Sequence, residues 1–207
     1  RAGLFFPALV SLAFAFSGGL FLQAIRAEVY TLNLLFILLA LKLALSWKQE
    51  TPAYDGGKAL KVAFLVGLGL ANHHLLVAAF VPALFLLLLH VPEGRALARQ
   101  RGLAIFAFTT MGLLVYCYLP LRAATDPIFN YGDPRTIGRL FDVILAKGFQ
   151  ASVAAPDIDV VANVVAAASM LEEALGWMIL GLAPVGLFLM FRGDKWLALT
   201  FLVLVLG

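Results

Sequence analysis

Long apolar runs, each close to the length of a membrane span, constrain this chain more than any other feature. Leu4 to Leu22 is almost wholly apolar, and Leu34 to Trp47 is interrupted only by Lys42 and Ser46. A helix that crosses the hydrocarbon core needs about 20 mostly apolar residues. Apolar residues make up 63% of the chain and charged residues 13%, against about 45–50% and 25% in soluble domains. The sequence therefore predicts an all-α integral membrane protein.

The apolar runs predict a polytopic helical bundle with about seven spans. Their expected limits are residues 4–24, 29–47, 60–73, 75–90, 103–121, 174–191 and 196–207. The third and fourth are expected to form a hairpin, because basic loops at 48–61 and 91–102 flank them and both should face the cytoplasm. The tip of this hairpin is then Asn72-His73-His74, and Gly67 and Gly69 let its helices approach closely.

This topology separates the charges of the chain. The predicted inner side carries ten Lys and Arg with four acids, and the outer side carries five Lys and Arg with eight acids. The excess of positive charge therefore lies inside, as in most membrane proteins. The whole chain, 1–207, is expected to be one transmembrane domain that belongs to a longer protein, since it begins without Met and stops inside an apolar run.

One long external segment, about 122–173, is expected to contain two helices. Pro134 to Lys147 has an apolar stripe at helical spacing, with Asp133 as its expected N-cap. Val160 to Leu171 forms the second helix, with Asp157 or Asp159 near its start. Both are expected to lie on the membrane surface.

Four polar clusters share the predicted outer face, and together they suggest a site. The first follows the first apolar run within the stretch RAEVYTLN, and its members are Arg26, Glu28, Tyr30 and Asn33. The other three are Asn72 with His73 and His74, Arg122 with Asp126, and Asn130 with Tyr131, Asp133 and Arg135. The planar guanidinium of Arg matches phosphate oxygens, and His can donate to phosphate or move a proton. A lipid-linked phosphorylated substrate fits such a set, with its tail between the helices.

Each cluster also has a structural interpretation that stays open here. Arg26 and Glu28 could form an ion pair at a turn, and His73-His74 could only cap the hairpin. Arg122 could be an interfacial anchor. Neither a metal nor another cofactor is expected, because two adjacent His point in different directions and no third ligand has metal-site spacing. Nucleic acid is not an expected partner, because the basic loops are explained by membrane topology.

Three of these stretches resemble one family in order and spacing. They are QAIRAEVYTLN (23–33), GLGLANHH (67–74) and YLPLRAATDPIFNYGDPRTIGRLFDVILAKGFQ (118–150). The chain resembles the protein O-mannosyltransferase-like family, a former domain-of-unknown-function family similar to membrane glycosyltransferases of the GT-C type. The third stretch is the most specific of the three.

The resemblance implies a GT-C-like fold and an enzyme that moves a sugar, mannose above all, from a polyprenyl- or dolichyl-phosphate donor to a protein hydroxyl on the periplasmic or lumenal side. It implies a bacterial inner membrane or the endoplasmic reticulum as the location. It also implies a catalytic Asp in the first external loop, which is expected upstream of residue 1, so that this chain alone should be inactive. The catalytic base is therefore not assigned here.

The same resemblance and the chemistry of the residues give the expected roles. Arg26 and Arg122 contact phosphate, and Asn72, His73 and His74 line the site, with a histidine donating to phosphate. Glu28 orients Arg26 or binds sugar hydroxyls, and Asn130 and Asp133 position the external loop. The alternative is a transporter or flippase of a lipid-linked or anionic substrate, and a third possibility is a structural subunit. The absence of a visible internal repeat favours the enzyme.

Overall fold

The computed structural model describes residues 5–25, 29–49, 56–90, 92–148 and 159–206. Its regular elements in these ranges are helices, so the all-α prediction is confirmed. In chain order they are α1 (Phe5–Ala15), α2 (Gly18–Ile25), α3 (Tyr30–Gln49), α4 (Gly56–His90), α5 (Pro92–Leu113), η2 (Leu114–Cys117), α6 (Tyr118–Ala123), α7 (Ile137–Ile144), α9 (Val160–Gly193) and α10 (Lys195–Leu206).

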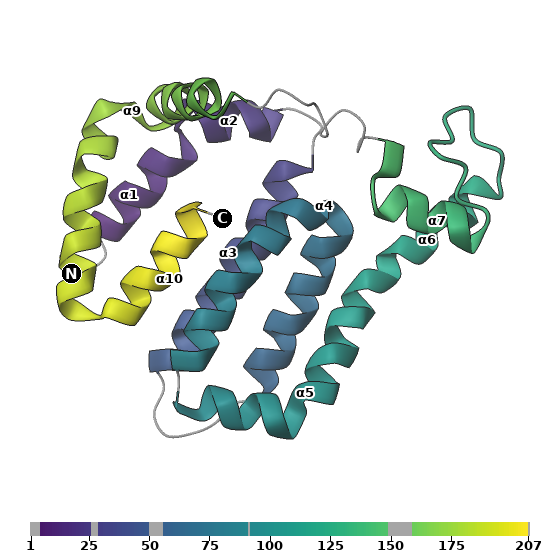
Figure 1. Cartoon of the computed structure of the whole chain (residues 1–207), viewed down its shortest axis with the longest axis horizontal. Coiled ribbons are helices and arrows are strands. Elements are labelled where there is room, and N and C mark those ends of the chain that lie inside the picture. Colours follow the sequence, from purple (N-terminus) through teal and green to yellow (C-terminus); the bar gives the residue numbers. More distant parts are fainter. Residues whose placement is uncertain (1–4, 26–28, 50–55, 91, 149–158, 207) are drawn as a thin grey trace.

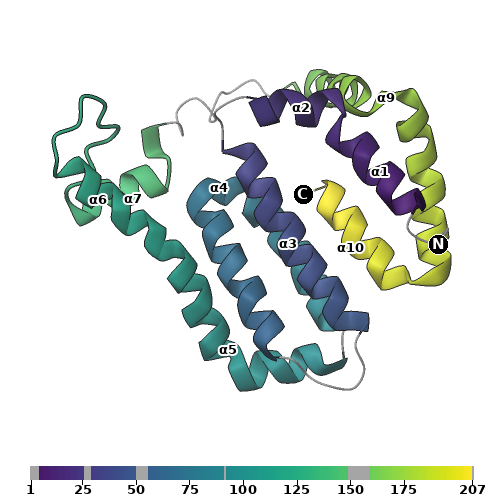
Figure 2. The same ribbon diagram turned by 180° about the vertical axis from the view of Figure 1, so that it is seen from behind.

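The predicted hairpin is confirmed in α4. His73 has non-helical backbone angles (φ −155°, ψ 89°), and the two arms on either side of it lie side by side in both views (Figure 1, Figure 2). A Cβ on Gly69 of the first arm would come 2.8 Å from Cγ2 of Val77 on the second, so the two arms are in close contact. Each arm has about 17 residues and is therefore about 25 Å long, which is close to the thickness of the hydrocarbon core.

Glycines allow the first arm of α4 to pack closely against its neighbours. A Cβ on Gly67 would come 2.1 Å from the Thr109 carbonyl oxygen of α5, and one on Gly112 would come 2.6 Å from the Phe64 carbonyl oxygen. Close backbone contact of this kind is typical of helix pairs in membranes. The prediction for the two hairpin glycines is half right. Gly69 faces the second arm at Val77, whereas Gly67 faces α5.

The first predicted span, 4–24, is not a single straight helix. It forms α1 and α2, which are bent by 55°. The Ser17 hydroxyl donates to the Phe14 carbonyl at 2.8 Å, and two glycines follow it, so the break falls where the side chain competes for backbone hydrogen bonds.

The prediction of an inner loop at 91–102 is wrong for residues 92–102. Residues 92–102 form the first turns of α5, which starts at Pro92, a favourable first helical residue. They run along one end of the bundle before α5 rises toward α6 (Figure 1).

The helix after Asp159 begins as predicted, and a break at Gly176 separates it from the helix that corresponds to the predicted span 174–191. Asp159 caps α9, since its side chain accepts from the Ala162 amide at 3.0 Å. Gly176, with φ +74°, breaks the helix in a left-handed conformation that glycine adopts easily. The part before this break lies across the end of the bundle near α2, and the part after it runs along the bundle (Figure 1, Figure 2).

Two described helices, Gly56–Leu87 and Arg95–Ala123, are long and apolar enough to cross a membrane, or three if the bent pair α1–α2 counts as one. Because Gly56–Leu87 folds back at His73, its length alone does not tell how many times it crosses a membrane. The number of seven spans stays a prediction.

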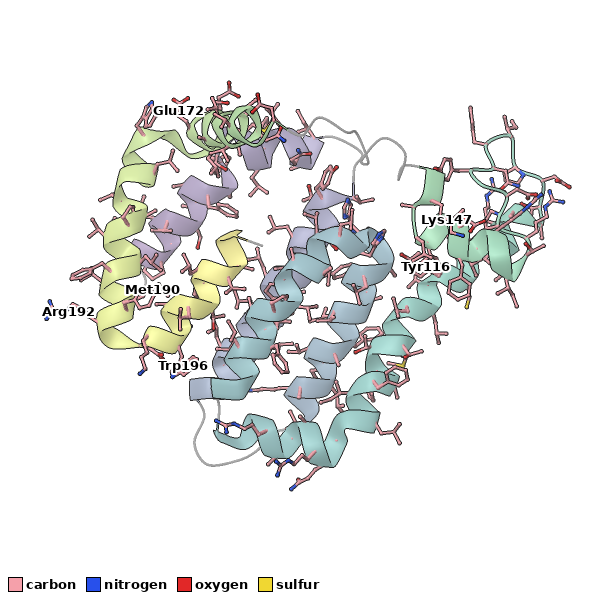
Figure 3. All side chains as sticks on the ribbon, viewed as in Figure 1. Tyr116, Lys147, Glu172, Met190, Arg192 and Trp196 are labelled. Atoms are coloured by element: carbon pink, nitrogen blue, oxygen red, sulfur yellow. The ribbon has the colours of Figure 1, made fainter. Side chains whose placement is uncertain are left out.

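The ends of the bundle agree with the charge pattern. The hairpin tip and α6 lie at one end, and the starts of α4 and α5 lie at the other (Figure 1). Glu172 and Lys147 lie toward the first end, and Arg192 and Trp196 toward the second (Figure 3). We call them the outer and the inner end. Which compartment each end faces stays a prediction.

Candidate functional site

The hairpin tip joins the two arms of α4 and presents the two histidines. The break at His73 leaves the first amides of the second arm without helical acceptors. The Leu76 amide donates to His73 Nδ1 at 3.4 Å, so His73 acts as a side-chain cap. In a neutral imidazole, one ring nitrogen accepts and the other carries the proton. Because Nδ1 accepts here, Nε2 is the donor. The capping interpretation of His73 is therefore confirmed, and one nitrogen of its ring is still free for another role.

The tip is bound to the first turn of α3. The Asn72 side-chain amide donates to the Val29 carbonyl at 2.8 Å, across 43 positions of sequence. The Tyr30 ring lies 5.5 Å from the His73 ring between centroids, and the His73 and His74 rings are 6.4 Å apart. The structure thus brings Tyr30 of the first predicted polar cluster together with the second cluster. We call Val29, Tyr30, Asn72, His73 and His74 the tip cluster.

Two predicted site residues, Arg26 and Glu28, lie outside the described residues. The residues on either side of them are placed, because the Thr31 hydroxyl donates to the Gln23 carbonyl at 3.0 Å and so links the start of α3 to the end of α2.

Asn33 does not face the outer surface. Its side chain is fully buried, and neither its amide nitrogen nor its oxygen has a hydrogen-bond partner among the described residues. A Cβ on Gly69 would lie 3.4 Å from its oxygen, so Asn33 sits between α3 and the hairpin. The expectation that Asn33 lines an outer polar site is wrong, since helix packing covers it.

Tyr116, in η2, also contacts the hairpin near its tip. The Tyr116 hydroxyl donates to the Leu70 carbonyl at 3.1 Å. Leu70 is in the last turn before the break, where carbonyls lack partners inside the helix. Sequence reasoning missed Tyr116, because nothing in its apolar neighbours marks it as a partner of a carbonyl 46 positions away.

The external loop after α6 is closed by a network of charges. The Asp133 carboxylate accepts from Asn130 Nδ2 at 2.8 Å and from Arg135 Nε at 2.9 Å, and it also pairs with Arg139. Arg135 pairs with Asp126 as well, and this hydrogen bond raises the pKa of the Arg135 guanidinium. We call these five residues the loop network.

The loop network overturns one prediction and changes another. Asp133 is not the N-cap of the following helix, because its backbone is left-handed (φ +40°) and its carboxylate is already engaged. Thr136 caps α7 instead, accepting from the Arg139 amide at 3.4 Å. Threonine is a regular N-cap residue, and that signal could have found it. The predicted cluster of Arg122 with Asp126 is divided, since Asp126 pairs with Arg135.

Arg122 stays apart from the loop network. Its guanidinium donates to the Thr125 hydroxyl at 2.7 Å, and that hydroxyl donates to the Arg122 carbonyl at 2.8 Å. Among the described residues it pairs with no carboxylate, whereas Arg135 and Arg139 both do. Arg122, near the end of α6, is therefore the arginine beside this loop whose charge no described carboxylate balances, and it can attract an anion.

The two polar regions do not merge into one pocket in the described residues. Both views show α6 and α7 to one side of the hairpin tip, beyond α5 (Figure 1, Figure 2). Tyr116 links them indirectly, since η2 leads directly into the helix that carries Arg122. The described members of the second, third and fourth clusters lie at one end of the bundle, as predicted. Contacts among the described residues join the first cluster to the second at Tyr30 and His73, and the third to the fourth within the loop network.

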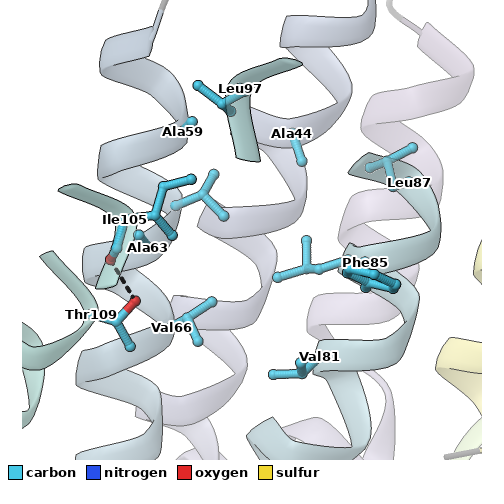
Figure 4. A pocket seen from close by; sticks show the side chains of 12 residues that line it. Ala44, Ala59, Ala63, Val66, Val81, Phe85, Leu87, Leu97, Ile105 and Thr109 are labelled. Carbon is cyan, nitrogen blue, oxygen red and sulfur yellow. Dashed lines mark hydrogen bonds between the residues drawn. The ribbon is translucent and has the colours of Figure 1, made fainter. Parts of the chain in front are cut away.

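An apolar cavity lies between the hairpin and α5, away from the tip. Its volume is about 200 Å³, and its lining includes Ala63, Val66, Val81, Phe85 and Thr109 (Figure 4). The Thr109 hydroxyl donates to the Ile105 carbonyl at 3.0 Å, so it is not free for a ligand (Figure 4). This cavity offers no catalytic group.

No group of three or more His, Cys, Asp or Glu residues that could hold a metal ion occurs in the part of the chain that the structure describes.

Comparison with known proteins identifies a matching family and a curated relative. Residues 3–95 match the family described as the protein O-mannosyl-transferase TMEM260 N-terminal domain. Protein O-mannosyl-transferase TMEM260 of Mus musculus is 29% identical over 126 residues, which are 60% of this chain and 18% of that relative. The matched part is thus a small portion of the curated relative. No solved structure matches the chain significantly.

Proposed function

Because its resemblance to an O-mannosyltransferase-like family is confirmed by these matches, we propose that this chain forms part of a membrane glycosyltransferase. The reaction is transfer of a sugar, mannose above all, from a polyprenyl- or dolichyl-phosphate donor to a protein hydroxyl at the outer end of the bundle. The observation that carries the proposal is the contact of the hairpin tip with the start of α3, through Asn72 and Val29 and through Tyr30 and His73.

The tip cluster supplies hydrogen-bond donors where the donor phosphate would leave. Transfer from a lipid phosphate places negative charge on the departing phosphate, and preorganised donors stabilise that charge. The Nε2 of His73 and the ring of His74 are the donors in this role, and Arg26 keeps the phosphate-binding role expected from the sequence. The Asn72 amide is engaged by Val29, so its part is to hold the tip in place.

Arg122 is the second phosphate contact in this proposal. A guanidinium forms paired hydrogen bonds with phosphate oxygens, and it is not neutralised by a carboxylate among the described residues. Asn130 and Asp133, by contrast, act through the loop network. Their role is to set the shape of the external loop over the site.

The position of the helix breaks favours an enzyme over a transporter. Transporter sites usually lie near the bilayer midplane, at discontinuous helices. The break at His73 lies at the end of the hairpin, at the outer end of the bundle (Figure 1). Polar groups at an interface suit a lipid whose head group remains at the surface.

The test is sugar transfer by the full-length protein in membranes, with mannosyl-phosphoryl-polyprenol as donor and a hydroxyl-containing peptide as acceptor. The double change His73→Ala/His74→Ala is expected to lower transfer at least about tenfold, or about 1.4 kcal/mol in the barrier. His73→Gln keeps a donor and an acceptor and should retain more activity. Normal transfer by the double variant at normal expression would remove the histidines from the site, and failure of the wild type to transfer from this donor would overturn the function itself.

A further inference from the structure

A further cavity lies partway along the bundle and has two cationic side chains in an otherwise apolar lining. It occupies about 390 Å³ between α3, the first arm of α4 and α5. Lys42 comes from α3 and Lys61 from α4. The apolar part of the lining includes Leu43, Phe64, Phe108 and Met111.

Both lysines lie within helices of the bundle rather than in loops. Lys42 is seven residues before Gln49, and Lys61 is five residues after Gly56. At 1.5 Å per residue, these positions are about 10 Å and about 8 Å from the inner ends of their helices. Both side chains are exposed on the bundle surface, so a ligand can reach them from the surrounding membrane.

Neither lysine is neutralised by the protein in its described part. No ion pair or hydrogen bond joins the ammonium group of Lys42 or Lys61 to a described residue. A single lysine at this depth can extend its ammonium group toward water. Two lysines from different helices that line one cavity repel each other, and an anion between them removes that repulsion.

We propose that this cavity binds an anionic phospholipid from the leaflet at the inner end of the bundle. The lipid phosphate lies between the ammonium groups of Lys42 and Lys61, and an acyl chain lies against Phe64, Phe108 and Met111. Basic pockets between transmembrane helices are known to hold such head groups. The apolar lining and the access from the membrane favour a lipid over a soluble anion.

This site is separate from the one under the proposed function. The tip cluster is at the outer end of α3 and α4, whereas Lys42 and Lys61 lie toward their inner ends. Lipid binding at the inner end therefore does not depend on whether the protein transfers sugar.

The experiment is photo-crosslinking of the full-length protein in phosphatidylcholine vesicles that contain a photoactivatable phosphatidylglycerol, with the labelled peptides identified by mass spectrometry. Labelling is expected on the α3 and α4 segments that carry the lysines. The change Lys42→Gln/Lys61→Gln should lower it about 25-fold, since each basic residue near a membrane surface contributes about a factor of five to anionic lipid binding. Lys42→Arg/Lys61→Arg should keep it.

The matched control is Lys58→Gln, which removes a lysine from the same arm of α4 but not from the cavity. Labelling of the wild-type protein by photoactivatable phosphatidylcholine gives a second comparison, which does not depend on whether a variant folds. Equal labelling by the two lipids would overturn the proposal, as would undiminished labelling of the folded Gln variant. Loss of labelling when millimolar inorganic phosphate is added would also overturn it, by showing that the site takes a soluble anion.

Discussion

The side chain of Asn72 donates a hydrogen bond to the backbone carbonyl of Val29 at 2.8 Å, and this bond attaches the hairpin tip to the first turn of α3. It joins two stretches that the sequence marks separately, one with the histidines and one with the arginine and glutamate. The predictions below concern this attachment, the arginine of the external loop, the loop network, the glycine contact of the bundle and the orientation of the chain.

Asn72→Ala is expected to destabilise the fold by about 1 kcal/mol, because the hydrogen bond between the hairpin tip and α3 is lost, while the Val29 carbonyl keeps the Asn33 amide as donor. The measurement is thermal unfolding of the purified protein in detergent, followed by circular dichroism. Asn163→Ala is the control, since Asn163 is exposed on α9. Equal stability of the two variants would show that the bond adds nothing to the fold.

Arg122→Ala is expected to reduce sugar transfer by the full-length protein at least about tenfold, or about 1.4 kcal/mol. Arg122→Lys keeps the charge but loses the planar fork, so its activity should be intermediate. Initial rates with the lipid-phosphate donor give the comparison. Arg192→Ala, at the inner end and beside the Phe188 ring, should transfer at the wild-type rate. Wild-type rates in Arg122→Ala would exclude it from the phosphate site.

Asp133→Asn is expected to open the external loop, because one carboxylate serves Asn130, Arg135 and Arg139. Limited proteolysis should then cut residues 124–136 several-fold faster than in the wild type, because fewer contacts oppose local unfolding. Asp142→Asn is the matched control, since Asp142 pairs with Lys147 at 2.5 Å outside the loop network. An unchanged cleavage rate in Asp133→Asn would contradict the structural role of the network.

Gly67→Ala is expected to destabilise the bundle by about 1–3 kcal/mol, because an added methyl group would overlap the Thr109 backbone. Backbone atoms cannot move aside as a flexible side chain can. Gly102→Ala on α5 has open space at its Cβ and should be neutral or slightly stabilising. Thermal unfolding in detergent compares the two, and similar melting temperatures would mean that α4 and α5 are not in close contact.

The orientation of the chain can be tested by labelling single cysteines after Cys117→Ser. His73→Cys should react with a membrane-impermeant maleimide from the outside, and Arg99→Cys only after the membrane is opened. The reason is the excess of Lys and Arg at the end of the bundle that carries Arg99. The reverse pattern would invert the topology and would place the tip cluster in the cytoplasm.

The sequence alone determined the helical membrane character, the hairpin and its tip. Apolar runs of sufficient length leave the backbone no partner in lipid except the helix itself. The basic residues on both sides of residues 60–90 required two crossings, and the break at His73 agrees. These features depend on local composition, so they could be predicted without knowing which helices touch.

The tertiary structure decided which side chains meet. Asp126 pairs with Arg135 rather than Arg122, Asn33 is covered by the hairpin, and Gly67 faces α5 rather than the second arm. Each outcome depends on which side of a helix faces its neighbours and on how the external loop folds. A hydrogen bond such as that of Asn72 to Val29 spans 43 positions. Its existence is set by packing of the whole bundle, which no local pattern of residues encodes.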